Sequence, residues 1–231
     1  MDTQHDYRIL LAEDAVSRLT KRVRVWNLPY PLNKGLALQM VSELRSLVKK
    51  VRYSFLPLDM LLSMDELRRI EEVVQQLAKL ILPPLGTRLE NTAQRMAVAE
   101  IRYSLWTLLG LRSRLALGEE NLPEYAVDVV GMEVGLVQKH PSADRLWVLK
   151  VGTPRFSLTV VTNLESVKKG EVRGVAILPP TEFFGVVSEG MICSDPLDRT
   201  YVGKRVPREL IHRAEIVNVV ERIARNVGRG S

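Results

Sequence analysis

The hydrophobic pattern of this chain changes once, near residue 120, and that change limits the folds open to it. Before it, apolar side chains recur every three or four residues over long stretches, as in helices that bury one face. After it come short apolar segments separated by glycine and proline turns, which are typical of β-strands. Two patterns within 231 residues predict two domains, residues 1–120 and 121–231.

The first domain is predicted to be a helical bundle. The pattern predicts helices over residues 8–24, 33–54, 63–82 and 87–118. The last two begin with Ser63-Met64-Asp65-Glu66 and Thr87-Arg88-Leu89-Glu90, the capping-box pattern that satisfies free amides at a helix start. Short turns that contain proline join the helices, so we expect an antiparallel bundle of three long helices and a shorter one.

The second domain is predicted to be a small β-barrel followed by a helix. Extended segments are expected at 127–137, 145–151, 158–162, 172–178 and 186–192. Gly131 and Gly135 interrupt the first segment, where we expect bulges or the sharp coiling that a closing barrel needs. The pattern over 207–227 indicates a terminal helix.

Charge and composition exclude several classes of protein. The formal charge of +6 and the many arginines suit a polyanionic partner, although a compositional bias of the genome would give the same arginines. Cys193 is the only cysteine, which excludes an internal disulfide, and the three histidines are too far apart to suggest zinc. We find no apolar run long enough for a membrane span and no signal peptide, so we expect a cytoplasmic protein without a membrane partner.

Two motifs in the second domain resemble those of a known family. They are His-Pro-Ser-Ala-Asp-Arg-Leu at 140–146 and Gly-Val-Val-Ser-Glu-Gly-Met at 185–191. Residues 125–200, about a third of the chain, thereby resemble the oligonucleotide-fold (OB-fold) tRNA-binding domain of some methionyl-tRNA synthetases and endothelial-monocyte-activating-polypeptide-type proteins. The resemblance implies a five-stranded OB-fold barrel, so together with the pattern of the rest of the chain we expect an α+β protein of helical bundle, barrel and C-terminal helix. It also implies recognition of tRNA by shape and backbone charge.

The resemblance and the charge pattern together name the candidate RNA-binding residues. They are His140, Arg145, Lys150, Arg155, Arg173, Ser188 and Met191. Ser188 and Met191 match the Ser-x-Gly-Met motif, which either faces RNA or merely turns the chain into its last strand. His140 either contacts phosphate or closes its own turn with Asp144. Trp147 and Phe156 either stack on bases or are buried.

Two features depart from the family pattern. Residues 179–184 are Pro-Pro-Thr-Glu-Phe-Phe, where stand-alone members of the family often carry basic residues. Exposed Phe183 and Phe184 would suit an apolar partner or a dimer contact. The terminal helix stands where dimeric members extend the barrel with β structure, so it packs on the barrel, closes a dimer or presents arginines to RNA. We expect a homodimer.

No motif for catalysis or cofactor binding is found, so we predict a protein that is not an enzyme and has no cofactor and no metal. The predicted function is a non-catalytic tRNA-binding protein that delivers tRNA to an aminoacyl-tRNA synthetase. The helical domain would then supply a docking surface or a second RNA contact. The alternative is a protein-interaction or dimerisation module, chaperone-like or a scaffold in a synthetase assembly, that uses the same barrel.

Overall fold

The computed structural model describes residues 1–229, and the chain divides into two compact units. The helical unit comprises Met1–Val127 together with the C-terminal helix from Val217 onward. The barrel unit is Asp128–Ile216. The boundary along the chain lies between Val127 and Asp128, where the prediction had it after residue 120, and most of the C-terminal helix groups with the helical unit. No helix in the described range is long and apolar enough to cross a membrane.

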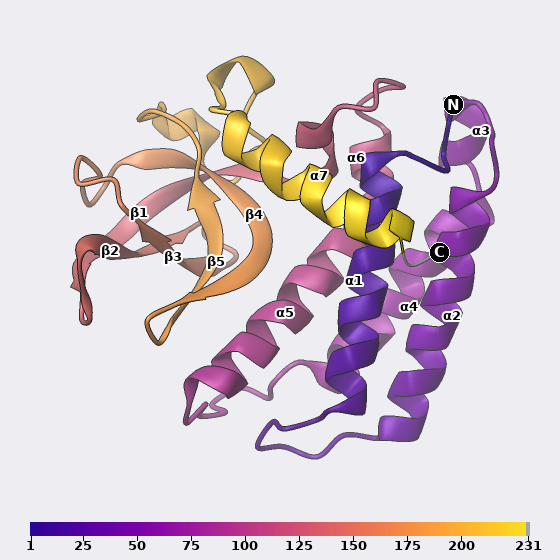
Figure 1. The fold of residues 1–231 in the computed structure, drawn as a ribbon, viewed down its shortest axis with the longest axis horizontal. Helices are drawn as coiled ribbons and strands as arrows, with labels where there is room; N and C mark the ends of the chain where they lie inside the picture. Colours follow the sequence, from indigo (N-terminus) through magenta and orange to yellow (C-terminus); the bar gives the residue numbers. More distant parts are fainter. Residues whose placement is uncertain (230–231) are drawn as a thin grey trace. The chain divides into compact units, whose positions relative to one another are not determined.

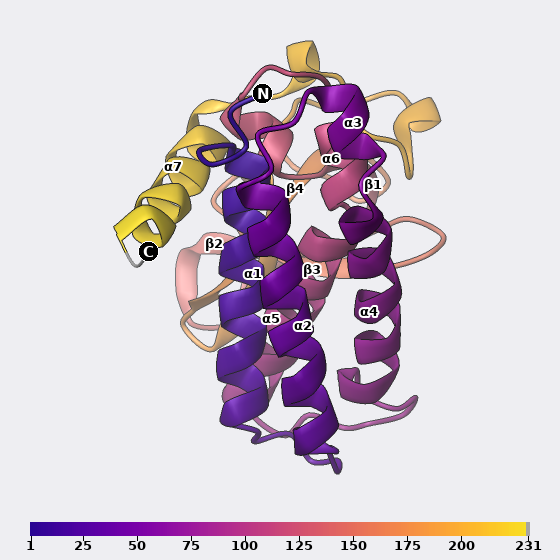
Figure 2. The same ribbon diagram turned by 90° about the vertical axis from the view of Figure 1, so that its right-hand side faces the viewer.

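Four long helices form the body of the helical unit (Figure 1 and Figure 2). Besides the C-terminal helix, its helices are α1 (Tyr7–Arg24), α2 (Lys34–Arg52), α3 (Leu58–Leu62), α4 (Asp65–Ile81), α5 (Thr92–Leu109) and α6 (Leu111–Leu115), followed by the 3-10 turn η1 (Pro123–Ala126). Helix α1 packs against α2 and α5, and α4 packs against the same two helices. Their apolar faces enclose a single core, in which Leu19, Leu44 and Leu77 are fully buried. The predicted bundle is confirmed.

Both predicted capping boxes are wrong. Ser63 closes the short helix α3, and its hydroxyl donates to the carbonyl of Asp59, so α4 begins after Met64 without a side-chain cap. The hydroxyl of Thr87 donates to the carbonyl of Pro84, and the N-cap of α5 is Asn91 instead. The pattern Ser/Thr-x-x-Glu fits both sites, but in each case the hydroxyl donates its hydrogen bond to a carbonyl a few residues earlier in the chain and does not cap the helix.

Two helix boundaries also differ from the prediction. Helix α5 ends at Leu109, and Gly110 separates it from α6. The terminal helix α7 (Ala214–Arg229) begins seven residues later than predicted, because the 3-10 turn η3 (Arg208–Leu210) follows Pro207. Its Ile216, Val220, Ile223 and Ala224 side chains are buried.

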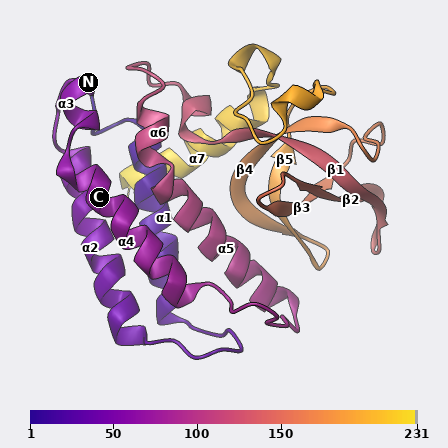
Figure 3. The ribbon, with the colours of Figure 1, turned by 180° about the vertical axis from the view of Figure 1, so that it is seen from behind.

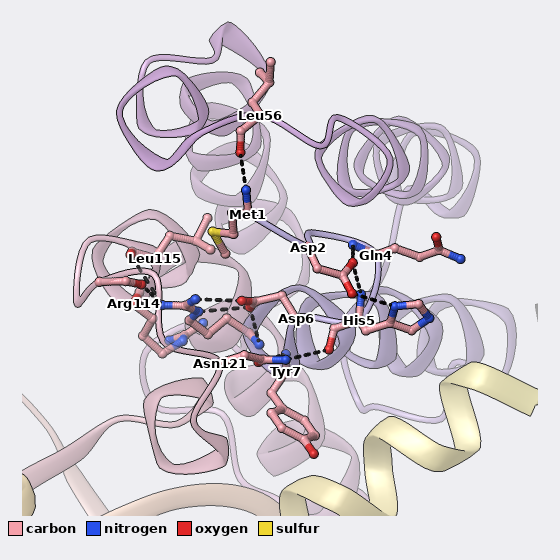
Figure 4. A network of polar contacts seen from close by, with 12 residues as sticks. Met1, Asp2, Gln4, His5, Asp6, Tyr7, Leu56, Arg114, Leu115 and Asn121 are labelled. Carbon is pink, nitrogen blue, oxygen red and sulfur yellow. Dashed lines mark hydrogen bonds and ion pairs between the residues drawn. The ribbon is translucent and has the colours of Figure 1, made fainter.

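A buried arginine joins the start of α1 to the last turn of α6. The Arg8 guanidinium donates to both carboxylate oxygens of Asp6, at 2.9 and 2.6 Å, and both side chains are almost completely buried. Its Nη1 also donates to the carbonyls of Arg114, Leu115 and Gly118, at 3.3, 3.5 and 2.7 Å. Figure 4 shows this network around Asp6 and Arg114. Asp6 is at the same time the N-cap of α1, since it accepts the Arg8 backbone N–H.

The barrel unit is built on one five-stranded antiparallel sheet (Figure 3). The strands are β1 (Val129–His140), β2 (Ala143–Gly152), β3 (Ser157–Thr162), β4 (Val172–Phe183) and β5 (Val186–Ile192), in the order β3-β2-β1-β4-β5. The first half of β1 pairs with β4 and the second half with β2, so the sheet bends around its own core. The predicted fold class is confirmed. However, the described residues show no backbone ladder between β3 and β5, so the barrel stays open along that seam.

Gly131 and Gly135 occupy their positions in β1 for different structural reasons. Gly135 lies at a bulge, because the register with β2 shifts between Val134 and Leu136. Gly131 shows no register shift. Instead, the chain after β5 returns along β1, and a Cβ on Gly131 would meet the Tyr201 carbonyl oxygen at 2.2 Å.

Strand β4 continues five residues past the predicted end at Leu178. Pro179 and Pro180 lie inside the strand, where the register with β5 shifts between Ile177 and Thr181. Such an irregularity accommodates residues that cannot donate to the sheet ladder. The segment 179–183 is therefore strand, and β4 ends in a tight hairpin.

Candidate nucleic-acid interface

Side chains of β5 close the seam that the backbone leaves open. The Ser188 hydroxyl accepts the backbone N–H of Val161 at 2.9 Å and donates to the carbonyl of Gly190 at 2.9 Å. The carboxylate of Glu189 accepts the backbone N–H of Thr159 at 3.0 Å. Ser188 is buried, and both hydrogen bonds of its hydroxyl stay within the protein. The serine of the Ser-x-Gly-Met motif thus joins β5 to β3.

We expect Ser188→Ala to loosen this seam. The change leaves the buried N–H of Val161 without its acceptor, which costs about 1–3 kcal/mol. Hydrogen exchange resolved by residue should show much faster exchange at Val161 than in the wild type. Ser142→Ala, which removes an exposed hydroxyl, is the matched control. Equal exchange at Val161 in wild type and Ser188→Ala would contradict the seam role.

The Arg173 guanidinium also forms its hydrogen bonds within the barrel unit. Its Nε and Nη2 donate to the carboxylate of Glu171 at 3.0 and 2.8 Å, and its Nη1 donates to the carbonyl of Ser194 at 3.2 Å. Burial raises the pKa of Glu171, but the backbone N–H of Lys168 and the Arg173 guanidinium outweigh it, so the pKa is lowered overall. Arg173 is only 5% exposed, which leaves little of it for a ligand.

His140 links the β1–β2 turn to the β4–β5 hairpin. Its Nδ1 accepts the backbone N–H of Ser142 at 3.1 Å, and its Nε2 lies 2.9 Å from the carbonyl oxygen of Phe183. These partners assign the hydrogen to Nε2, since only that nitrogen faces an acceptor. The alternative that His140 closes its turn is supported, but with Ser142 and not with Asp144. Met191 is half-buried and pairs with Ala176 in the sheet.

Three of the candidate cations are exposed. They are Arg145, Lys150 and Arg155, on β2 and in the loop that follows it. The Lys150 ammonium donates to the hydroxyl of Thr159 at 2.6 Å, across the β2–β3 pair. Trp147 and Phe156 are both half-buried, and the Lys139 ammonium lies 5.9 Å from the centre of the Trp147 ring. Strand β2 and its loop therefore carry the exposed positive charge among the candidates.

An open depression of about 570 Å³ lies beside Lys150. Its lining includes Glu133, Gly135, Lys150, Gly152, Thr153 and Arg199. Arg199 is well exposed, and its Nη2 donates to the Glu133 carboxylate at 2.9 Å. Two cations and nearby hydroxyl groups are the donors that phosphate and ribose oxygens accept from.

Sequence reasoning missed Arg199 as part of this site. The residue follows the barrel strands by several positions, and no local pattern marks it. It reaches the depression because the chain after β5 runs back along β1, with bridges from Val202 to Gly131 and from Arg205 to Val130. The pairing of Gly152 with Glu133 places a second glycine beside the bulge at Gly135, and the two small residues leave the depression open.

The thiol of Cys193, which also belongs to the barrel unit, is not placed to react as a nucleophile. Cys193 is buried, and burial raises the pKa of its thiol to about 12, so it is protonated at neutral pH. Within residues 1–229, no group of three or more His, Cys, Asp or Glu side chains could hold a metal ion.

Comparison with known proteins identifies both parts of the chain. Residues 1–118 match the family model "Alpha helical domain", and residues 129–211 match the model "Putative tRNA binding domain". Among solved structures, the MetRS related protein from Pyrococcus horikoshii is 22% identical, with a TM-score of 0.34, over 36% of this chain and 93% of that one. No curated protein matches. The resemblance seen in the sequence is confirmed, and the chain belongs to the Alpha helical domain family, with a domain of the tRNA binding family joined to it at residues 129–211.

Proposed function

We propose that this protein is a non-catalytic tRNA-binding protein whose barrel unit holds tRNA by shape and backbone charge. The observation that carries the proposal is the open depression with Lys150 and Arg199, because it lies within the residues that match the tRNA binding family. The exposed Arg145 and Arg155 extend the positive charge along β2 and its loop. Structured RNA is commonly bound through phosphates and ribose hydroxyls, since the deep groove of its helices excludes side chains.

The candidate residues then fall into two roles. We propose that Arg145, Lys150 and Arg155 contact the RNA backbone together with Arg199, and that the half-buried Met191 also contacts RNA. His140, Arg173 and Ser188 would act as positioning residues. This division is supported by burial and hydrogen bonding, since the polar groups of those three bond to the protein itself.

A salt series tests the proposal. Purified full-length protein should bind labelled, unfractionated tRNA more tightly than duplex DNA of equal charge, and increasing salt should weaken the binding steeply. Lys150→Ala and Arg155→Ala should each weaken tRNA binding and reduce the slope against salt by about one, as expected for a lost phosphate contact.

The control is Arg68→Ala, which removes an exposed arginine from α4 in the helical unit. It should leave both affinity and slope close to those of the wild type. Absence of tRNA binding by the wild-type protein at low salt would overturn the proposed function and would favour a protein-interaction module.

Delivery to an aminoacyl-tRNA synthetase is the second step of the proposal. It needs a protein-docking surface, and the helical unit exposes Tyr53, Phe55 and Met60 at the connection between α2 and α3. Phe55 has a positive φ of 51°, which is uncommon for a bulky residue. Aminoacylation by purified synthetases, with wild-type protein and with Phe55→Ala, tests this step.

A homodimer and a cytoplasmic location belong to the same proposal, and sedimentation of the free protein tests the dimer.

A further inference from the structure

Phe184, at the tip of the β4–β5 hairpin, has an unfavourable backbone conformation. Phe184 has φ of 46° and Gly185 has φ of 89°, so both turn residues are in the left-handed region. Gly185 adopts it freely, but a phenylalanine there is strained. Phe184 is also 70% exposed, so burial of its ring does not offset the strain. Strain that persists at an exposed side chain points to a function for that side chain.

The ring of Phe184 rests on His140. The two ring centres are 6.2 Å apart and the planes are inclined by 76°, an edge-to-face contact. His140 is itself held on both nitrogens, by the backbone N–H of Ser142 and by the carbonyl of Phe183. The imidazole of His140 therefore supports the Phe184 ring on one side and leaves the rest of that ring accessible. A ring that is already ordered loses little conformational freedom when a ligand binds.

The surroundings of the ring suit a single flat ligand. The neighbouring Thr181, Glu182 and Gly185 are exposed and not hydrophobic, and the flanking apolar residues Phe183 and Val186 are half-buried, so Phe184 is the one well-exposed apolar side chain of this hairpin. A stable protein interface needs a far larger area, whereas a nucleobase matches one aromatic ring. The carboxylate of Glu182 disfavours a phosphate at the tip, which leaves the face of a base as the complementary part of RNA. Lys139 and Arg145, on the strands flanking the His140 turn, can hold the adjoining backbone.

We propose that Phe184 is a stacking platform for one unpaired base of the bound tRNA. The inference rests on the proposed function, and it adds a base contact to the backbone contacts on β2. It also assigns a role to His140, which positions the ring without touching RNA. Because stacking involves no charge, this contact should contribute to affinity without changing the dependence on salt.

The test compares three substitutions at Phe184 in the full chain. Phe184→Ala removes the ring, Phe184→Gly removes it and also relieves the backbone strain, and Phe184→Trp keeps an aromatic surface. We expect the first two to weaken binding of unfractionated tRNA by about 5- to 150-fold, the range for one base stacked on an aromatic side chain. Phe184→Trp should bind like the wild type. The slope against salt should not change in any of the three.

Short oligouridine and a fully paired RNA duplex separate the base contact from the backbone contact. Binding of oligouridine should fall with Phe184→Gly, while binding of the duplex should not. Leu164→Ala, which truncates another exposed apolar side chain of the barrel unit, is the control and should change neither.

The outcomes also separate the two proposals. If wild-type protein binds no tRNA, the proposed function fails. If wild-type protein binds tRNA and Phe184→Gly binds it equally well, the tRNA-binding function stands and the stacking platform is overturned. A loss in Phe184→Gly that Phe184→Trp shares would also overturn it, because both rings can stack.

Discussion

Arg8→Met is expected to destabilise the helical unit by about 3–5 kcal/mol, the range for removing one partner of a buried ion pair. Methionine fills much of the same space but cannot donate hydrogen bonds. The change would leave the carboxylate of Asp6 buried without its guanidinium, and the carbonyl of Gly118 without its 2.7 Å donor. The start of α1 and the last turn of α6 would both lose their anchor. Unfolding by urea, followed by helical circular dichroism, measures the change.

Two further variants separate the buried network from a general loss of positive charge. Arg68→Met removes an exposed arginine whose partner Asp65 is also exposed, and it should shift stability by less than about 0.5 kcal/mol. Adding Asp6→Asn to Arg8→Met should recover part of the loss, because the buried carboxylate is then neutral. A shift for Arg8→Met no larger than that for Arg68→Met would contradict the role of Arg8.

The fold was predictable where the signal is local. Strands β2, β3 and β5 were predicted to within two residues of their observed ends. The signals that mark them, short apolar segments and the glycine turns between such segments, are local in the sequence. The capping boxes failed because Ser63 and Thr87 bond to carbonyls that precede them. The short helix α3 has too few residues to show a helical period, so the sequence pattern does not reveal that Ser63 ends it.

The candidate site was predictable only in part, for a related reason. Lys150 and Arg155 are exposed by local strand and turn geometry, which a sequence shows. The role of Ser188 depends on Val161, twenty-seven positions earlier in the chain, and the role of Arg199 depends on the return of the chain along β1. Neither neighbour can be inferred from a motif, although the motif correctly indicated the family.

Gly131→Ala is expected to cost the barrel unit about 3 kcal/mol, at the upper end of the range for overpacking. The new Cβ would lie 2.2 Å from the carbonyl oxygen of Tyr201 and 2.7 Å from its carbonyl carbon, and these are backbone atoms. They cannot move alone, because Gly131 donates to the carbonyl of Lys204 and accepts the N–H of Gly203, both at 2.9 Å. The returning segment must therefore shift away from β1. Hydrogen exchange at Gly203 and urea unfolding measure the loss.

Gly135→Ala is the matched control on the same strand. Its Cβ would have an ordinary contact of 3.6 Å, to the carbonyl oxygen of Lys150, so stability should change little. The two variants also separate stability from binding. Gly131→Ala displaces the segment that carries Arg199 and should weaken tRNA binding together with stability, whereas Gly135→Ala adds a methyl group to the wall of the depression in an intact barrel. If Gly131→Ala were as stable as Gly135→Ala, the close packing of the returning segment on β1 would not be what requires a glycine at position 131.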